Sequence, residues 1–408
     1  KGGWCYLVKG KGNRRFHNGT TADVNSLYPS MMSSESGNYY PIGEPIFWTG
    51  NYIPEDVEHA HDKYFFVRIR TRFYLKPGYL PFIQIKGSPL YQGNECLESS
   101  DVYDPVTQKK YRFYRDLHGN PVPTTVELTL TQTDYQLIRE HYNLEDFEIL
   151  DGCWFHAACG IFDEYIEKYK RIKLESTGAM RELAKLFLNN LYGKMASSMD
   201  SSFKVPYLKE DKSIGFTMVS AKDKLPGYIP VGSAITSYAR NFTIRAAQKN
   251  YHGVDKPGFI YADTDSIHCD LTPDQIVGIE VHDKNFCCWK LESQWDVAWY
   301  TRQKTYIEHI TVDDKGTTLD NPYYLVKCAG MPDKCKNTFI KSLERWTPAD
   351  EEGKPPEKRY TPTPEEQEVI DKRYNLEDFT VGLKVPGKLR PKRIRGGVVL
   401  VECAYEMR

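Results

Sequence analysis

The chain has 408 residues, of which 40% are hydrophobic and 13% aromatic, and its formal net charge is −1 at pH 7. This length exceeds what one compact core usually holds, so two to four subdomains are expected. The near-zero charge excludes a general polycation, and any nucleic-acid contact must come from local clusters. The absence of an 18-residue apolar run and of a charged-then-apolar leader predicts a cytoplasmic protein without a membrane contact.

The first predicted elements are a short strand over 20–24 and a helix that starts near Leu27. Asp23 closes this apolar strand in the segment D-V-N-S-L-Y-P of residues 23–29. A carboxylate at a strand end can face a cleft and bind a divalent cation. Tyr28 is either a ring beside a sugar pocket or a packing residue at the start of the helix.

Residues 35–160 follow as an irregular segment that is rich in Pro, Gly and aromatic residues. We expect strands near 65–74 and 126–130 and a short helix near 134–141. The segment is predicted to be an inserted subdomain.

Residues 163–196 are predicted to be helical, with a break at 176–178 that makes an antiparallel pair. At about 100° per residue, one narrow stripe of the second helix collects mainly polar side chains. These residues are Gly178, Arg181, Lys185, Asn189 and Tyr192. Apolar side chains are expected to cover most of the remaining circumference. Such a stripe is either a solvent-exposed face or a binding surface to which Lys173 adds a third cation.

Residues 197–229 are turn-rich and predict a protruding hairpin, and 258–270 predict a strand, a tight turn and a second strand. The turn carries the segment Y-A-D-T-D-S of residues 261–266. By itself, Asp263-Thr264-Asp265 is as typical of a solvated turn as of a functional site, and the D-x-D motif of a metal-dependent glycosyltransferase is a further alternative. Together with Asp23 and the helical stripe, it predicts nucleotidyl transfer by two metal ions.

Two charged segments lie near the end of the chain. Residues 344–378 hold an acidic excess and a Pro-Pro pair, which predict a surface insertion or a flexible linker. Residues 382–395 hold six cations and no acid.

These motifs resemble those of a known family. D-x-x-S-L-Y-P, K-x-x-x-N-x-x-Y-G and Y-x-D-T-D-S resemble motifs A, B and C of family B DNA polymerases, and K-T-Y at 304–306 resembles the family's K-x-Y element. Stretches at 43–46, 204–210, 327–331 and 396–401 resemble the protein-primed phage branch. The resemblance covers nearly the whole chain, with Asn190 standing where the family usually has serine.

The resemblance implies an α+β right-hand fold with a palm built on an antiparallel sheet, helical fingers and a small thumb. Its implied parts are palm (1–34 and 230–336), fingers (161–196), thumb (337–408, with the acidic insertion 344–378), and two insertions (35–160 and 197–229) that resemble terminal-protein regions 1 and 2.

The resemblance also implies roles for individual residues. Asp23, Asp265 and the Val24 carbonyl would bind two Mg²⁺ ions, with Mn²⁺ as a possible substitute, and Asp263 would be a supporting catalytic carboxylate. The nucleotide would contact Tyr28 as sugar gate, Leu27, Lys173, Arg181, Lys185, Asn189 and Tyr192. Primer and template would contact Lys304, Tyr306, Thr264, Ser266, Gly193, Lys194, Lys388, Arg390 and Lys392.

The predicted function is that of a monomeric, template-directed DNA polymerase core in protein-primed, strand-displacing viral replication. Its partners would be primer-template DNA, deoxynucleoside triphosphates and a terminal-protein primer. Because the 22 residues before Asp23 hold no Asp or Glu, no proofreading exonuclease is expected.

Two alternatives compete with this prediction. A catalytically degenerate polymerase fold could act only as a DNA-binding or terminal-protein-binding module, but it would not need Asp23, Asp265, Lys185 and Tyr192 together. A glycosyltransferase using Asp263 and Asp265 would leave the first aspartate motif and the helical stripe without a purpose.

Overall fold

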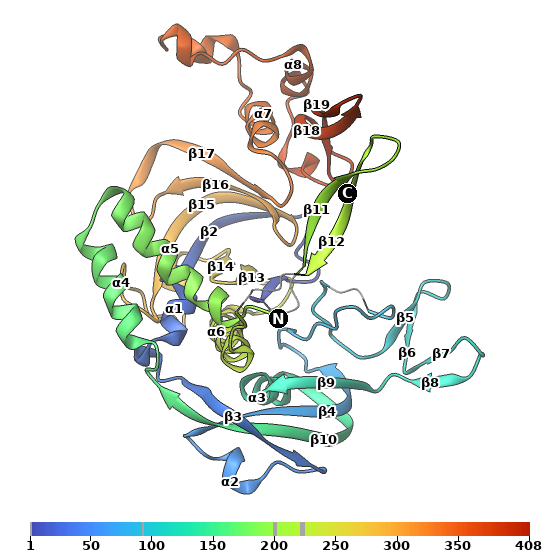
Figure 1. Cartoon of the computed structure of the whole chain (residues 1–408). Helices are drawn as coiled ribbons and strands as arrows, with labels where there is room; N and C mark the ends of the chain where they lie inside the picture. Colours follow the sequence, from blue (N-terminus) through green and yellow to red (C-terminus); the bar gives the residue numbers. More distant parts are fainter. Residues whose placement is uncertain (1, 92–93, 199–201, 221–224) are drawn as a thin grey trace.

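The central element of the computed structural model, which describes residues 2–91, 94–198, 202–220 and 225–408, is a seven-stranded sheet. All neighbouring strands are antiparallel, in the order β1-β13-β14-β2-β15-β16-β17. They are β1 (Cys5–Leu7), β13 (Phe259–Asp263), β14 (Ser266–Cys269), β2 (Arg15–Val24), β15 (Trp289–Arg302), β16 (Thr305–Val312) and β17 (Thr318–Cys328). The two aspartate motifs therefore meet on neighbouring strands, β2 and β14 (Figure 1).

Helix α6 (Ile229–Asn250) packs against one face of this sheet. Small buried residues such as Ala239, Ala246 and Ala247 let it lie close to β13 and β14. The sequence did not predict α6, because its small and polar residues blur the helical hydrophobic period. The short helix α1 (Leu27–Met32) and the 3-10 turns η1 (Ser34–Ser36) and η2 (Pro273–Gln275) complete this part.

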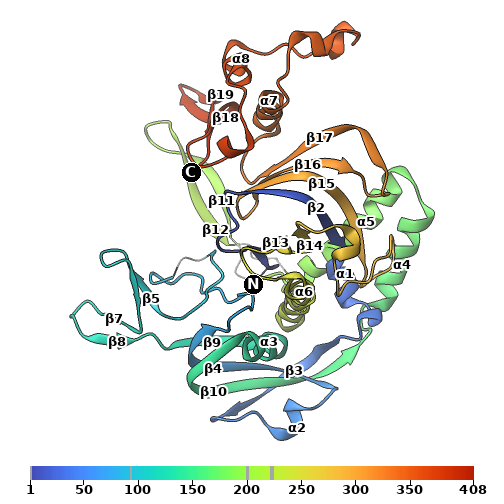
Figure 2. The same cartoon turned by 180° about the vertical axis from the view of Figure 1, so that it is seen from behind.

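The segment between η1 and the helical pair is a second sheet, with strand order β3-β10-β4-β9. Its elements are β3 (Tyr39–Thr49), α2 (Glu55–Glu58), β4 (Lys63–Leu75), β9 (Val126–Thr131), α3 (Gln132–His141) and β10 (Tyr142–Cys159). Two small hairpins project from it: β5 (Val102–Asp104) with β6 (Lys109–Tyr111), and β7 (Phe113–Arg115) with β8 (Pro121–Pro123). Helices α3 and α6 lie between the two sheets (Figures 1 and 2).

The expectation that this segment is irregular is wrong, although the strands near 65–74 and 126–130 and the helix near 134–141 are confirmed. Strand β10 has 18 residues, and its pairing shifts register at three places along its length. Such bulges break the two-residue alternation by which a strand is recognised in a sequence.

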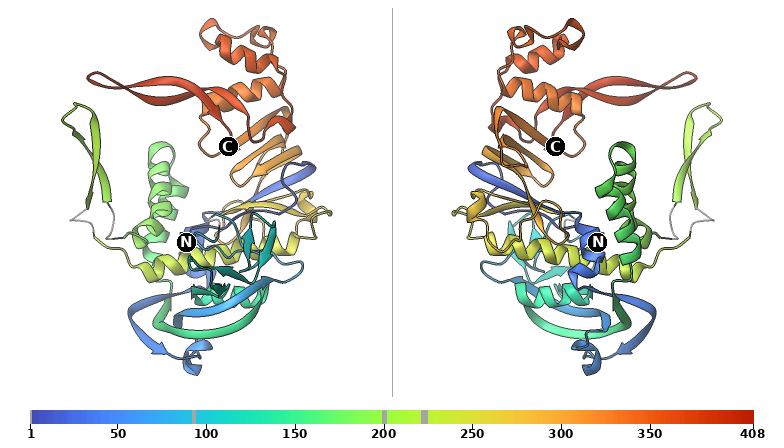
Figure 3. Two further views of the ribbon diagram at one scale, coloured as in Figure 1. Left: turned by 90° about the vertical axis from the view of Figure 1, so that its right-hand side faces the viewer. Right: turned by 90° about the vertical axis from the view of Figure 1, so that its left-hand side faces the viewer.

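The predicted helical pair is confirmed as α4 (Asp163–Glu175) and α5 (Gly178–Met195). The buried side of α5 is a single stripe of Ala184, Leu188 and Leu191. Three other apolar residues of α5, Leu183, Leu186 and Phe187, are 46–54% exposed. The pair therefore stands away from the central sheet, with most of α5 exposed (Figure 3).

The predicted hairpin after α5 is present as β11 (Ser202–Leu208) and β12 (Ile214–Ser220). Positions 199–201 and 221–224 of the expected segment lie outside the described residues. This hairpin and a second one, β18 (Lys384–Ile394) with β19 (Gly397–Glu406), project toward the same side of the molecule (Figure 3).

The C-terminal part has its own core around α7 (Asp333–Leu343). The acidic segment 344–378 is ordered rather than a flexible linker, and it forms η3 (Pro348–Glu351), η4 (Pro356–Lys358), α8 (Pro364–Asp371) and η5 (Leu376–Asp378). Glu351 is buried and accepts hydrogen bonds from Trp346 Nε1 at 2.9 Å and the Tyr360 amide at 3.0 Å. The acidic composition predicted a solvated segment, whereas the structure shows that one of these acids, Glu351, is buried and holds the segment together through its hydrogen bonds. Among the described residues, no helix is long and apolar enough to cross a membrane.

Candidate active site

The candidate site is a cavity of about 480 Å³ where β2 and the β13–β14 hairpin end. Asp23 lies opposite Ser266 in the sheet, and the Val24 amide donates to the Asp265 carbonyl at 2.8 Å. Thr264, at the hairpin tip, has the left-handed φ of 63° that so tight a turn requires. Seven predicted site residues line the cavity: Asp23, Asp263, Thr264, Asp265, Ser266, Lys304 and Tyr306.

The carboxyl groups of Asp23 and Asp265 are half-buried and lie close to further acidic residues. Burial raises the pKa of Asp23 to about 8, and the neighbouring carboxylates of Asp265 and Glu292 add to the effect. Burial also raises the pKa of Asp265 to about 6, with Asp263 and Glu292 contributing. Raised carboxyl pKa values in a cleft are typical of a functional site, and a divalent cation would relieve the repulsion.

The donor set fits hard cations such as magnesium, which prefer carboxylate and carbonyl oxygens. In the described part of the chain, no group of three or more His, Cys, Asp or Glu side chains could hold a metal ion by itself. Ions bound by Asp23 and Asp265 would therefore need further oxygens from the main chain, water or a substrate.

Asp263 differs from the other two aspartates because it has a cationic partner. Lys304 Nζ lies 2.8 and 3.0 Å from its carboxylate oxygens, and the Lys304 amide donates to Tyr261 Oη at 2.9 Å. Lys304 thereby ties the start of β16 to the hairpin that carries Asp265.

Three cations of the helical pair gather beside the first motif. Lys173 Nζ donates to Ser26 Oγ at 3.4 Å, and Arg181 donates to the Lys173 carbonyl at 3.1 Å. Burial lowers the pKa of Lys173, and the nearby charges of Arg181 and Lys185 lower it further. Because these like charges repel one another, an anionic ligand bound beside them would be stabilised.

An aromatic pair lies next to this cluster. The rings of Tyr28 and Tyr192 are stacked, with centroids 4.7 Å apart and planes inclined by 27°. Asn189 lies exposed on α5, whereas the Leu27 side chain is 3% exposed and packs in the core. The structure therefore does not place the side chain of Leu27 where a nucleotide could touch it.

Other predicted contact residues lie outside the cavity. Lys194 lines a separate pocket next to the hairpin base, together with Pro226 and Tyr228. Lys388, Arg390 and Lys392 lie on the exposed β18, which projects from the C-terminal part (Figure 3).

Sequence reasoning missed three charged residues that line the cavity: Glu292, Lys327 and Lys336. Glu292 lies on β15 and helps to raise the pKa of both Asp23 and Asp265. In the sequence, Glu292 is recognisable only as an acidic residue within a segment that is rich in aromatic residues. Nothing local, however, shows that this strand pairs with β2.

Gly3 lies directly behind the hairpin tip. A Cβ added to Gly3 would lie 2.4 Å from Thr264 Oγ1, whereas one added to Gly2 would meet nothing within 4 Å. Thr264 cannot easily move, because its amide donates to the Trp4 carbonyl at 2.7 Å and its carbonyl accepts from Thr243 Oγ1 at 2.8 Å. Glycine at position 3 thus permits the close approach of these two segments.

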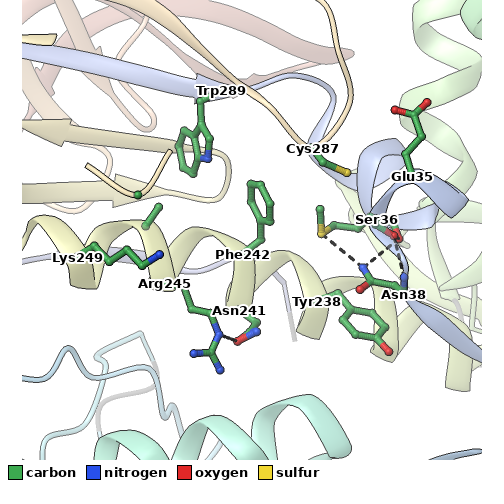
Figure 4. A pocket seen from close by; sticks show the side chains of 13 residues that line it. Glu35, Ser36, Asn38, Tyr238, Asn241, Phe242, Arg245, Lys249, Cys287 and Trp289 are labelled. Carbon is green, nitrogen blue, oxygen red and sulfur yellow. Dashed lines mark hydrogen bonds between the residues drawn. The ribbon is translucent and has the colours of Figure 1, made fainter. Parts of the chain in front are cut away.

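A second pocket, of about 290 Å³, lies along α6 (Figure 4). Its polar lining groups largely satisfy one another, as Arg245 does with Asn241 at 2.7 Å and Asn38 with the Met31 carbonyl at 3.3 Å. It contains none of the predicted site residues.

Comparison with known proteins identifies the family. The family described as DNA polymerase type B, organellar and viral, matches residues 1–276, and the chain belongs to this family. The DNA polymerases of Bacillus phage phi29 and Streptococcus phage Cp-1 are 37% and 32% identical to it, over 418 and 387 residues. The alignments cover 100% and 95% of this chain, and 61% and 56% of those polymerases.

A solved structure of phi29 DNA polymerase, complexed with primer-template DNA and incoming nucleotide, matches with a TM-score of 0.73 at 34% identity. The match covers 100% of this chain and 61% of the phi29 DNA polymerase chain. The predicted α+β polymerase fold is therefore confirmed. The chain spans about three-fifths of the length of these phage relatives.

Proposed function

We propose that this chain is a template-directed DNA polymerase core that adds deoxynucleotides to a primer 3′-hydroxyl with the help of two magnesium ions. The main support for the proposal is that a cluster of acidic side chains and a cluster of cationic side chains both lie beside the first aspartate motif. Half-buried carboxyl groups on β2 and the β13–β14 hairpin lie at one cavity, and three cations gather beside the same motif on α4 and α5. Nucleotidyl transfer needs both, because phosphate anions must be held while the attacking hydroxyl is activated.

The metals would be held by Asp23, Asp265 and the Val24 carbonyl, and they would supply charge neutralisation at the attacking and leaving oxygens. Lys173, Arg181 and Lys185 would hold the triphosphate. Tyr28 and Tyr192 would open their stack to frame the sugar and the base. Lys304 and Tyr306 would hold the primer terminus, where productive orientation alone contributes several kcal/mol.

The direct test is to incubate the chain with primed template, magnesium and labelled deoxynucleotides. Templated primer extension supports the proposal. Binding of DNA without extension would favour a catalytically degenerate polymerase fold, and sugar transfer from a nucleotide sugar would favour a glycosyltransferase.

Lys185→Ala should raise the KM for deoxynucleotides about 10–100-fold, since a charge-assisted hydrogen bond to phosphate contributes about 1.5–3 kcal/mol. The Kd for primed template, measured by fluorescence anisotropy, should change little. Lys168→Ala is the matched control, because Lys168 lies over the ring of Tyr169 on α4. An equal loss of DNA affinity in Lys185→Ala would assign this lysine to the duplex instead.

Gly3→Ala should slow nucleotide addition about 10–100-fold, because displacement of the Asp263-Thr264-Asp265 turn misplaces reacting groups. Gly2→Ala is the control, since its added methyl group meets no neighbour. Single-turnover rates for both folded variants provide the measurement. Equal rates for the two would show that the turn tolerates the clash.

We further propose that the chain works in protein-primed, strand-displacing replication, with the β11–β12 hairpin enclosing template DNA. Hydrogen bonds from Ser213 lower the pKa of Asp211, and the nearby Arg393 guanidinium adds to the effect. The tips of the β11–β12 and β18–β19 hairpins therefore lie near each other, and both carry exposed side chains.

Deletion of residues 200–226 should therefore cut processivity and strand displacement while sparing single-nucleotide addition. Extension of a primer against a downstream duplex, with a trap for released enzyme, provides the measurement. Loss of single additions by a folded deletion variant would show that the hairpin shapes the active site. Priming itself is tested by supplying a protein hydroxyl donor and labelled deoxynucleotide, and looking for label on the protein.

A further inference from the structure

A buried hydrogen-bonded pair, His268 and Glu308, lies beneath the candidate active site. Their side chains are 2% and 1% exposed, and His268 Nδ1 contacts Glu308 Oε1. The same carboxyl group accepts from Tyr300 Oη at 2.7 Å and from Thr21 Oγ1 at 3.2 Å. A buried carboxyl group is strongly unfavourable unless it is hydrogen-bonded, so these donors determine where Glu308 lies.

The four side chains come from four consecutive strands of the central sheet: His268 from β14, Thr21 from β2, Tyr300 from β15 and Glu308 from β16. Strands β2 and β15 separate β14 from β16 in the sheet (Figure 1). The contact between His268 and Glu308 therefore spans the two intervening strands on one face. It connects the hairpin of Asp265 to the strand that follows Lys304.

The pairing register places this network in the row of side chains next to the row that contains Asp23. Asp23 lies opposite Ser266, and Thr21 lies opposite His268. Because side chains two residues apart share a face of a strand, His268 and Thr21 lie directly behind that first row. Ser266 Oγ lies 3.3 Å from His268 Nε2, so the two rows are also hydrogen-bonded to each other.

The network also holds Tyr306, which precedes Glu308 by two residues on β16. The Tyr306 ring lies edge-on to His268, with centroids 5.1 Å apart, and is stacked on Tyr300 at 5.4 Å. Tyr306 and His268 both line the cavity that contains Asp23 and Asp265. His268 thus touches both the aspartate hairpin and the ring proposed to meet the primer.

We propose that His268 and Glu308 are positioning residues, which keep Tyr306 and the primer 3′-hydroxyl in register with Asp23 and Asp265. The inference rests on the proposed polymerase function. Hydrogen bonds, unlike apolar contacts, fix both distance and direction, and an error of about 1 Å at the reacting centre costs on the order of 100-fold in rate.

The test compares His268→Leu, which removes the ring's hydrogen bonds, with His268→Asn, whose amide nitrogen takes the place of Nδ1 and can still donate to Glu308. Rapid-quench single-nucleotide addition on primed template separates two quantities. The burst amplitude counts folded, DNA-bound enzyme, and the burst rate reports chemistry and its alignment. His268→Leu should lower the burst rate about 10–100-fold with a wild-type Kd for duplex DNA. His268→Asn should recover the rate to within about threefold of wild type.

His141→Leu is the matched control for a buried histidine that has only a structural role. His141, the last residue of α3, is 3% exposed, and its Nδ1 lies 2.7 Å from the Leu80 carbonyl. Its loss should lower the Tm and the burst amplitude but leave the burst rate unchanged. Glu308→Gln should resemble His268→Leu in rate, and the double variant should lose no more than either single one.

A burst rate for folded His268→Leu within twofold of wild type would overturn the inference, as would an equal rate loss in His141→Leu. Failure of His268→Asn to recover the rate would also overturn it. Absence of any templated extension by the wild-type chain would instead refute the proposed function, so the two failures are distinguishable.

Discussion

Replacing Asp265 by asparagine should abolish primer extension, with a loss of at least about 1,000-fold, while duplex binding stays nearly unchanged. In the proposed mechanism the carboxylate supplies charge to bound metal, and an amide of the same shape cannot. DNA affinity should survive because the cations proposed to contact the duplex, such as those on the exposed β18, lie elsewhere. Single-turnover extension and DNA anisotropy on the same preparation provide both measurements. Extension within tenfold of wild type would refute the assignment of Asp265 as a metal ligand.

The same variant should be more stable than wild type when no metal is present. The pKa of Asp265 is raised to about 6, so its ionisation is less favourable in the folded protein than in the unfolded chain. The folded state therefore loses stability as pH rises from about 4 through 6, and asparagine removes that loss. We expect a gain of about 1–3 kcal/mol in the free energy of unfolding above pH 6, and none near pH 3.

Asp274→Asn is the control for both measurements, because Asp274 lies outside the cavity and accepts from Thr272 Oγ1 at 2.6 Å. It should retain extension and show no gain in stability at high pH. Loss of activity together with lower stability in Asp265→Asn would indicate a role in folding rather than in metal binding.

Replacing Tyr28 by valine should raise ribonucleotide use relative to deoxynucleotide use, on the order of 10–100-fold. The Tyr28 ring is stacked on Tyr192 beside Ser26 and the three cations, where it would meet the sugar of a nucleotide held by them. In the proposed mechanism, removal of the ring also removes its collision with a 2′-hydroxyl. Because the ring would contact the deoxyribose as well, deoxynucleotide insertion should weaken a few-fold.

The measurement is kcat/KM for insertion of dCTP and of CTP opposite a template guanine. Tyr28→Phe keeps the ring and is the matched control, with discrimination close to wild type. An unchanged ratio in Tyr28→Val would mean that another residue is the sugar gate.

The local sequence was sufficient to predict those elements whose secondary structure depends only on residues a few positions away. Asp23 was predicted at the end of a strand and Asp265 in a hairpin turn, and both lie there, because apolar strands followed by turn residues have few other ways to fold. The helical pair α4 and α5 was predicted for a similar reason, since a glycine at its break separates two continuous helical patterns.

Tertiary structure decided what depends on a distant partner. The hexapeptide Y-N-L-E-D-F occurs at 142–147 and at 374–379 and has two conformations. The first copy starts β10, where Tyr142 pairs with Leu75 of β4. In the second copy, Asn375 caps the short turn η5, and Phe379 is buried against α7. Identical local preferences give a strand where an edge of β4 is available to pair, and a turn where none is.

The same reason accounts for the remaining differences. Glu292 lies at the cavity because β15 pairs with β2. The side chain of Leu27 does not reach the cavity because it packs in the core. The acidic segment 344–378 is ordered around buried Glu351. In each case the deciding energy comes from contacts between residues far apart in the chain. The sequence by itself determined which chemistry the chain carries, whereas only the tertiary structure decided which side chains share the cavity with it.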